Sequence, residues 1–390
     1  CIRDRARSYH SCFALSREIL VKTSSLDAKA SLALCITALL CANGPWSESR
    51  LDSHADSLFD MLLHFYSTLS SHSTTTEDNT HSVLLALSYV LQAYPLKFLE
   101  PDVCKVLDHV FSEGAPLEQY FMLRALWGYL DRDATAPQEE AQLDMRKQLA
   151  GQNKVDAGVA SALIQRYAVP ILQATLEVNV PKTQQVASEI VKLSVLQGLS
   201  HPMQCVPYLV ALETGDNLLL RHKAVQLHRY LLEKHSSMLS TRFGESVTMA
   251  FRFQQRLTSA PRGVRPGTKR EAMFQVWYDL LVDHRQAKLQ FLRALVRLLD
   301  VQQDLSPTPD DVNLSVFIAD TLQVLEYRYA EEPLTILYEL KMLDASTGIQ
   351  IAGIIGRRLR REEHLREPSP LTDEENDSDV ESVESRPMTD

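Results

Sequence analysis

The sequence predicts an all-α fold in which antiparallel helix pairs stack into a solenoid. Only 13 of the 390 residues are Gly and 7% are aromatic, while Leu, Ala and Gln dominate the periodic segments, a composition that suits helices better than sheets. Apolar residues recur at i, i+3, i+4 and i+7 through most of the chain, and the alternation typical of strands is nearly absent. A single globular helical bundle is the competing architecture.

Residues 1–130 are expected to form N-terminal helical repeats. Turn residues such as Asn43-Gly44-Pro45 and Glu113-Gly114-Ala115-Pro116 separate the periodic segments, because Gly and Pro interrupt helices. Ser70–Thr80 is rich in Ser and Thr and is expected to form an exposed loop. The expected helices are Asp27–Ala42, Asp52–Leu69, Thr80–Tyr94, Asp102–Phe111 and Leu117–Leu130.

Residues 131–156 mix charges with Gln and Ala around Pro137, and we expect a mobile connection there with a surface helix over Gln138–Leu149. Residues 157–366 resume the repeating pairs. Pairs of roughly 35–45 residues without a strict consensus are typical of HEAT repeats, in which each pair covers its apolar face by stacking on its neighbours. The expected helices are Gly158–Val178, Thr183–Leu199, Pro202–Leu212, Asn217–Lys234, Ser236–Leu257, Arg270–Asp283, His284–Asp300, Val312–Tyr327, Glu332–Leu343 and Gly348–Glu363.

The stretch from His201 to Thr214 combines two prolines with an apolar run. Pro202 suits the first turn of a helix, where its missing N–H has no consequence, and Pro207 is expected to kink whatever continues from it. The following Thr214-Gly215-Asp216-Asn217 has the chemistry of a helix end and a new start. We therefore expect a short buried helix between two longer ones.

Residues 367–390 are expected to form a disordered acidic tail. They hold nine acids and one Arg, so the net charge of −10 is concentrated there and residues 1–366 are close to neutral. Few large apolar residues are present to offset the entropy of ordering. Phosphate added to this segment would deepen its charge. The candidate phosphorylation sites are Ser369, which precedes a proline, and Thr372, Ser378 and Ser382.

The six cysteines show no paired CxxC spacing and mostly lie inside apolar patterns, so we expect buried, reduced thiols in a nuclear or cytosolic protein. The most apolar run, Ala30–Ala42, is too short to cross a membrane. Because the chain begins at Cys1, it is expected to be part of something longer. The cysteines are Cys1, Cys12, Cys35, Cys41, Cys104 and Cys205.

Motifs for catalysis, cofactors and metals are missing, so we expect neither an enzyme nor a cofactor. The segment from Gly263 to Lys269 resembles a phosphate-binding loop, but its glycine spacing is short and no strand precedes it. His222, His228 and His235 are six and seven residues apart, a spacing that does not gather them on one helical face as metal ligands.

Two clusters of cations remain as candidate sites. The first is an irregular loop in which four cations fall within nine residues, with two further arginines on the preceding helix, and it suits DNA phosphates because these need charge without base-edge geometry. The second lies near the end of the last helix, where cations also complement the helix dipole or the acidic tail. The loop cluster is Arg262, Arg265, Lys269 and Arg270 with Arg252 and Arg256; the second cluster is Arg357, Arg358, Arg360 and Arg361.

Four stretches, in this order, resemble the C-terminal region of the adherin (Nipped-B type) family of cohesin-loading subunits. Ordered matches over roughly residues 184–343 are more specific than any one of them. The stretches are His201–Thr214, Pro261-Arg262-Gly263-Val264-Arg265, His284-Arg285-Gln286 leading into Phe291-Leu292, and Phe317-Ile318-Ala319-Asp320 with Glu331-Glu332-Pro333-Leu334.

The resemblance implies a nuclear, chromatin-associated HEAT-repeat protein that binds cohesin through its kleisin and ATPase head subunits. It further implies stimulation of the cohesin ATPase without ATP hydrolysis by the protein itself, and topological loading onto DNA for sister chromatid cohesion. A smaller loader subunit would bind a far N-terminal region that this chain lacks, and no membrane is involved. The alternatives are an importin-like or adaptor scaffold that binds only proteins, and a helical-repeat regulatory subunit of a phosphatase or kinase.

Overall fold

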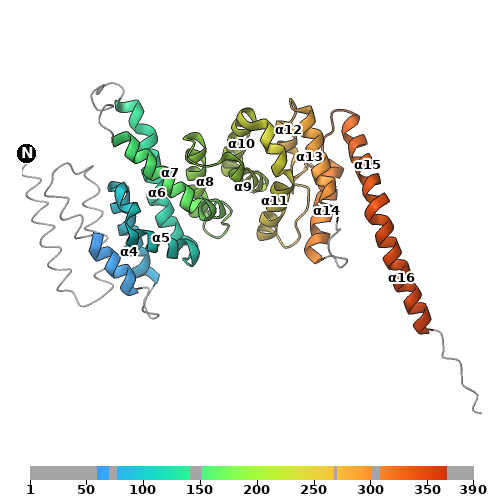
Figure 1. Ribbon diagram of the computed structural model, residues 1–390, viewed down its shortest axis with the longest axis horizontal. Coiled ribbons are helices and arrows are strands. Elements are labelled where there is room, and N and C mark those ends of the chain that lie inside the picture. Colours follow the sequence, from blue (N-terminus) through green and yellow to red (C-terminus); the bar gives the residue numbers. More distant parts are fainter. Residues whose placement is uncertain (1–58, 70–76, 141–151, 268–269, 301–307, 367–390) are drawn as a thin grey trace, which may run out of the picture. The chain divides into compact units, whose positions relative to one another are not determined.

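The computed structural model describes residues 59–69, 77–140, 152–267, 270–300 and 308–366 (Figure 1). The chain divides into two compact units, Cys1–Ile336 and Leu337–Asp390. The predicted helix at Asp27–Ala42, the Ser70–Thr80 loop up to residue 76 and the acidic tail lie outside the described residues.

Regular structure in the described ranges is helical, which confirms the all-α prediction. A single antiparallel bridge joins Val264 to Ala272. After a helix over residues 59–69, the elements are α4 (Glu77–Ala93), the 3₁₀ turn η1 (Pro95–Leu99), α5 (Pro101–Ser112), α6 (Pro116–Glu140), α7 (Gln152–Ala174), α8 (Pro181–Leu196), α9 (Pro202–Thr214), α10 (Leu218–Leu239), η3 (Ser240–Arg242), α11 (Phe243–Leu257), α12 (Gln275–Leu280), α13 (Arg285–Arg297), α14 (Pro309–Val324), α15 (Glu331–Leu343), the π-helical turn η4 (Asp344–Gly348) and α16 (Ile349–Arg366).

Neighbouring helices stack on one another along the first unit. α6 packs against both α4 and α8, and α9 packs against both α10 and α11 (Figure 1). Each helix therefore covers its apolar surface with its neighbours, which is how a helical repeat acquires a continuous core. The predicted stack of helices is confirmed.

Proline and short polar caps set where the helices begin. α5, α6, α8, α9 and α14 all start at a proline, whose fixed φ suits the first helical position and whose missing N–H would have no partner there. At α10 the Asn217 Oδ1 accepts from the N–H of Leu219 at 3.1 Å and of Leu220 at 3.3 Å. The predicted stop and restart around Gly215 is confirmed, and so is the short helix between two longer ones.

The kink expected at Pro207 does not interrupt the helix: α9 runs through Pro207 to Thr214, and Pro207 is itself buried. α10 and α11 both pack on α9, and this packing offsets the backbone hydrogen bond that proline cannot donate. A proline kink does occur in α7, where Tyr167 has φ −105° and ψ 17°, three residues before Pro170.

Two other predicted boundaries need correction. The helix predicted over Arg270–Asp283 shrinks to the six residues of α12, because Arg265 and Met273 make the backbone hydrogen bonds of the bridge with Glu271 and Gly263 instead. α6 extends ten residues beyond the predicted end at Leu130, to Glu140. The connection predicted over residues 131–156 therefore begins as helix, and residues 141–151 lie outside the description.

An aromatic cluster forms the core of the region between α10 and α14. Trp277 is 1% exposed, and its ring centroid lies 4.6 Å from that of Phe291 and 5.5 Å from that of Phe243. Phe274 makes edge contacts with Trp277 and Phe317 at 5.8 Å each. Such pairs add to the free energy of burial through their edge-to-face geometry. The cluster ties together helices that are far apart in the sequence.

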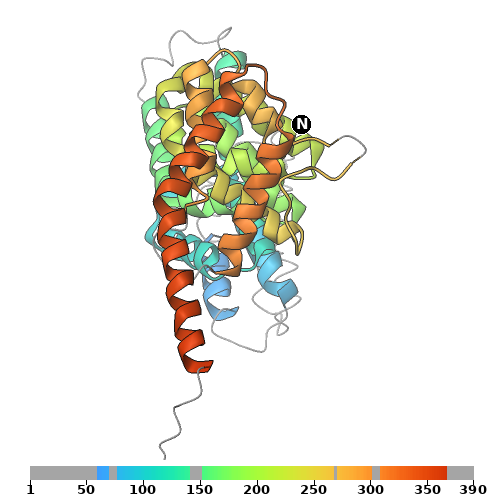
Figure 2. The ribbon, with the colours of Figure 1, turned by 90° about the vertical axis from the view of Figure 1, so that its right-hand side faces the viewer.

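The second unit is a helical rod. The C-terminal half of α15, η4 and α16 continue one another (Figures 1 and 2). Among the described residues, no helix is both long enough and apolar enough to cross a membrane.

Candidate functional site: the basic loop and its supporting contacts

The predicted basic loop joins α11 to α12 and is held at Gly263. The Gly263 carbonyl accepts from the N–H of Met273 at 2.8 Å and from the Thr321 hydroxyl at 3.2 Å. A Cβ at this position would overlap the Phe317 carbonyl and lie 2.6 Å from the Thr321 nitrogen. The glycine is therefore required because the loop packs closely on α14. This packing, rather than phosphate binding, explains why a glycine stands in the segment that resembles a phosphate-binding loop.

Arg265 points into the protein. Its guanidinium donates to the Glu213 carbonyl at 2.6 Å and to the carbonyls of Thr214 and Met273 at 3.4 Å each. Glu213 and Thr214 are the last residues of α9, so the cation lies at the negative end of that helix dipole. Burial lowers the pKa of Arg265, and the nearby Arg221 lowers it further. Arg265 therefore supports the fold and is not free to bind a phosphate.

Arg262 has a partner but stays accessible. Its guanidinium contacts the Asp320 carboxylate twice, at 2.5 and 3.0 Å, and this hydrogen bonding raises the pKa of Arg262. The Arg262 side chain is 65% exposed, whereas that of Asp320 is 13% exposed. Two N–H groups are thus engaged by the carboxylate while the outer edge of the guanidinium faces solvent.

The remaining members of the loop cluster are more available. Arg270 is exposed and makes one long hydrogen bond, 3.4 Å to the Gln323 side chain. Arg252 and Arg256 are exposed one turn apart on α11, and Arg256 reaches the Leu176 carbonyl at 3.5 Å. Lys269 lies outside the described residues.

A pocket of about 420 Å³ brings part of the predicted set together. Arg262, Arg265 and Arg270 all line it, with the acids Asp216 and Asp320. Arg252 and Arg256 do not line it. The pocket therefore has mixed charge, and its accessible cations are Arg262 and Arg270.

The second predicted cluster lies on α16, where Arg357, Arg358 and Arg360 are exposed. The backbone of Arg361 is helical, and nothing is described of its side chain. The phosphorylation candidates fall outside the described residues; they are Ser369, Thr372, Ser378 and Ser382.

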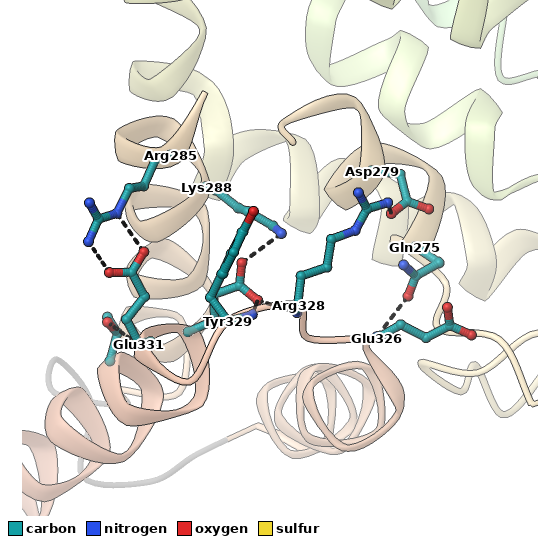
Figure 3. Close-up of polar contacts among 10 residues, drawn as sticks. Gln275, Asp279, Arg285, Lys288, Glu326, Arg328, Tyr329 and Glu331 are labelled. Atoms are coloured by element: carbon teal, nitrogen blue, oxygen red, sulfur yellow. Dashed lines mark hydrogen bonds and ion pairs between the residues drawn. The ribbon is translucent and has the colours of Figure 1, made fainter. Parts of the chain in front are cut away.

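Sequence reasoning missed a dense set of polar contacts between α13 and the segment that joins α14 to α15 (Figure 3). Arg285 makes a two-point ion pair with Glu331, one of whose contacts is 2.6 Å. Lys288 Nζ lies 2.7 Å from a Glu332 oxygen, with the two side chains 4% and 2% exposed. The Lys288 ammonium also lies 3.9 Å from the centre of the Tyr278 ring, a favourable position for a cation.

Glu332 is the centre of this arrangement. Its other oxygen accepts from the N–H of Arg328 at 2.7 Å and of Tyr329 at 3.2 Å. Burial alone would raise the pKa of Glu332, but Lys288 and these backbone donors outweigh it and hold the pKa below its usual value. The Arg285 guanidinium likewise lowers the pKa of Glu331.

A second buried polar pair lies beneath the loop. His228 Nδ1 is 2.8 Å from a Glu213 oxygen, with side chains 1% and 4% exposed, and the imidazole contacts the Trp277 ring at 5.7 Å. His228 is therefore bound within the core. Among the described residues, no group of three or more His, Cys, Asp or Glu side chains is placed to hold a metal ion.

The two cysteines in the described residues differ in how deeply they are buried. Cys205 is buried, and burial raises its pKa to about 11, while Cys104 is only half-buried. The other four cysteines are outside the described residues.

The four stretches that carry the family resemblance contact one another. Arg265 from the second stretch binds the end of the first at Glu213. Arg262 in the same stretch binds Asp320 in the fourth, and Arg285 in the third binds Glu331, also in the fourth. The sequence held a signal for one buried charge: Glu213 follows an apolar run in its helix, where a charge needs a buried partner, and its side chain pairs with His228.

Comparison with known proteins extends the resemblance. Residues 160–343 match the family model described as "Sister chromatid cohesion C-terminus". The chain is 26% identical to the Nipped-B-like protein of Homo sapiens over 304 residues, which are 75% of this chain and 10% of that protein. It is 27% identical over 281 residues to the sister chromatid cohesion protein mis4 of Schizosaccharomyces pombe, covering 66% of this chain and 17% of mis4.

A solved structure shares the fold. The C-terminal fragment of the Chaetomium thermophilum cohesin loader SCC2 matches 92% of this chain and 27% of its own, with a TM-score of 0.71 and 19% sequence identity. The chain spans about a tenth of the length of the first curated relatives it matches.

Proposed function

We propose that this chain works as part of a cohesin-loading subunit, because its residues 160–343 match the sister chromatid cohesion C-terminal family model and it is similar to Nipped-B-like proteins. In this role it binds cohesin through the kleisin and ATPase head subunits, binds DNA in chromatin, and stimulates the cohesin ATPase without hydrolysing ATP. It acts in the nucleus, and the smaller loader subunit binds a region outside this chain.

The observation that supports a DNA-binding role is the set of accessible arginines beside the pocket. Phosphate contacts need cations that reach solvent and are not already neutralised. Arg252, Arg256 and Arg270 meet this condition, Arg262 meets it in part, and Arg265 does not. The proposed phosphate contacts are therefore Arg252, Arg256, Arg270 and the outer edge of Arg262.

Salt dependence of DNA binding tests this set. We expect the variant Arg252→Glu/Arg256→Glu/Arg270→Glu to bind duplex DNA more weakly, with the slope of log affinity against log salt smaller by roughly 0.9 for each lost phosphate contact. The matched control reverses three exposed cations on α8 and α10 instead, Lys182, Arg229 and Lys234. An equal loss in both triple variants would remove the assignment and leave only general charge attraction.

Cohesin itself tests the wider role. Addition of the full-length protein to purified cohesin and DNA is expected to raise the rate of ATP hydrolysis, and the two are expected to co-precipitate. Failure of both measurements would refute the loading role. Success of both, with DNA binding unaffected by the arginine reversals, would indicate a scaffold that contacts only protein through this region.

A further inference from the structure

α16 is a helix without a packing partner among the described residues of its unit. The element it contacts most is η4, the turn from which it continues. Ile351, Ile355 and Leu359 follow one another at i+4 spacing, so they form one stripe on the helix. These side chains are 44%, 52% and 55% exposed. A contiguous exposed apolar stripe marks a binding surface more often than isolated apolar residues do.

The composition of α16 is poorly suited to a helix that stands alone. It contains Gly353 and Gly356 in its interior and four isoleucines, and each interior glycine costs about 1 kcal/mol relative to alanine. In proteins most of the stability of a helix comes from packing of its apolar face rather than from intrinsic propensity. Packing against another segment would supply the missing stability.

Neither the packing nor the backbone conformation of α16 requires a glycine at position 353 or 356. A Cβ at Gly353 would meet only the Arg357 side chain, at 3.8 Å, and one at Gly356 only that of Arg360, at 3.9 Å. Neither φ lies in the left-handed region. Gly356 lies three residues before Leu359 and one turn after Ala352, so it borders the apolar stripe. Small residues there permit close approach of a second backbone.

Positive charge borders one edge of the stripe. Arg358 lies three residues after Ile355 and is therefore a surface neighbour of a stripe position, whereas Arg360, one residue after Leu359, lies away from the stripe. Arg357, Arg358 and Arg360 are all exposed. α16 as a whole carries five Arg against two Glu. A complementary partner therefore presents apolar side chains flanked by carboxylates.

We propose that α16 docks an acidic amphipathic helix of a partner protein. The apolar side of that helix covers Ile351, Ile355 and Leu359, its Asp and Glu residues pair with Arg358 at the edge of the stripe, and the net positive charge of α16 attracts it. This is helix-on-helix recognition, in which apolar positions set the register and the charges set partner choice. The proposal does not depend on the DNA-binding role, because it uses none of the loop arginines.

Other occupants fit these observations less well. The chain's own residues 367–390 are acidic, but their large apolar residues Leu371, Val380, Val383 and Met388 are nine, three and five positions apart, which makes no helical stripe. A second copy of α16 would bring arginines against arginines. Nucleic acid would neutralise the arginines and leave the apolar stripe uncovered.

Synthetic helical peptides as long as α16 provide the test. One has Leu at i, i+3, i+4 and i+7 with Glu on both flanks, a second replaces each Glu with Lys, and a third scrambles the first. Fluorescence anisotropy with the whole chain is expected to show binding of the acidic peptide only. Ile355→Glu/Leu359→Glu should weaken it at least about tenfold, since buried central residues dominate helix docking. Leu218→Glu, at an apolar residue 68% exposed on α10, is the matched control and should leave binding unchanged.

A charge reversal keeps the test informative if the apolar variant fails to fold. Arg357→Glu/Arg358→Glu/Arg360→Glu is expected to transfer binding from the acidic to the lysine peptide. Hydrogen exchange of residues 349–366 should be fast in the free chain and slow with the acidic peptide. Three results would overturn the proposal: equal binding of the scrambled peptide, binding that appears only after residues 367–390 are deleted, or a dimer in light scattering that Ile355→Glu abolishes.

Discussion

The region from α9 to the start of α15 and the helix α16 place their charged side chains in opposite ways. In the first, charged side chains pair inside the protein, as Lys288 does with Glu332 and His228 with Glu213. In α16 the side chains of Arg357, Arg358 and Arg360 are exposed, as are those of Ile351 and Ile355. The paired charges fix how helices join, whereas the unpaired ones are available to another molecule. Side chains that identify the family therefore serve mainly its architecture.

The largest effect is expected at the buried ion pair. Glu332→Leu and Lys288→Met should each lower the free energy of unfolding by about 3–5 kcal/mol, because each leaves an uncompensated buried charge. The double variant should recover most of this loss, because two apolar side chains then face each other. Chemical denaturation of the three variants measures these differences, and a double variant as unstable as the sum of the singles would contradict the pairing.

Gly263 tests the close approach of the loop to α14. Gly263→Ala should destabilise the protein by about 1–3 kcal/mol, the range for overpacking a filled site, because the new Cβ meets backbone atoms of Phe317 and Thr321. Gly158→Ala is the control, since nothing lies within 4 Å of the added Cβ. In α7 that change should stabilise by up to about 1 kcal/mol through helix propensity. Thermal melting of both variants distinguishes clash from general sensitivity.

Substitutions of the two loop arginines Arg265 and Arg262 should differ clearly in their effect on stability. Arg265→Met leaves the carbonyls at the end of α9 without this donor and should cost about 1–3 kcal/mol, while affecting DNA only through loss of fold. Arg262→Ala removes an ion pair that is exposed and screened by solvent, so it should cost much less stability than Arg265→Met. If urea denaturation ranks them in the reverse order, the structural role of Arg265 is wrong.

The smallest effect concerns pH. The pKa of Glu332 is lowered in the folded protein, so its contribution to stability is present above the ordinary glutamate pKa, about 4.3, and is lost as pH falls through the lower folded value. Melting temperature should therefore fall on acidification below about pH 4.3. The slope should be shallower in Lys288→Met/Glu332→Leu, which lacks the titrating group. Identical slopes would exclude this carboxylate as a source of acid sensitivity.

Local chemistry explains why much of the fold could be predicted. Proline at helix starts, Asn217 as a cap and the apolar period each act within a few residues, and the helices they predict are present. Predictions became wrong where distant contacts decided the outcome. The short α12 follows from backbone hydrogen bonds in the bridge, such as the one from the Met273 N–H to the Gly263 carbonyl.

The candidate site was harder to predict for the same reason. Six cations in the loop cluster look alike in sequence, yet Arg265 is committed to the end of α9, 52 residues earlier. Asp320, which forms an ion pair with Arg262, comes 58 residues later in the sequence. Only the fold separates accessible from committed arginines. The DNA-phosphate role of the accessible ones stays a prediction.

The aromatic cluster has a mechanical consequence. Repeat proteins usually unfold repeat by repeat, since each repeat contacts only its neighbours. Phe274 contacts Trp277, Phe291 and Phe317, and Phe243 contacts Trp277 and Phe291, so the cluster spans three successive helix connections. When tension is applied to the two ends of the chain, α11 to α14 should hold together and release in a single step, and the chain should yield first in the segments outside this cluster.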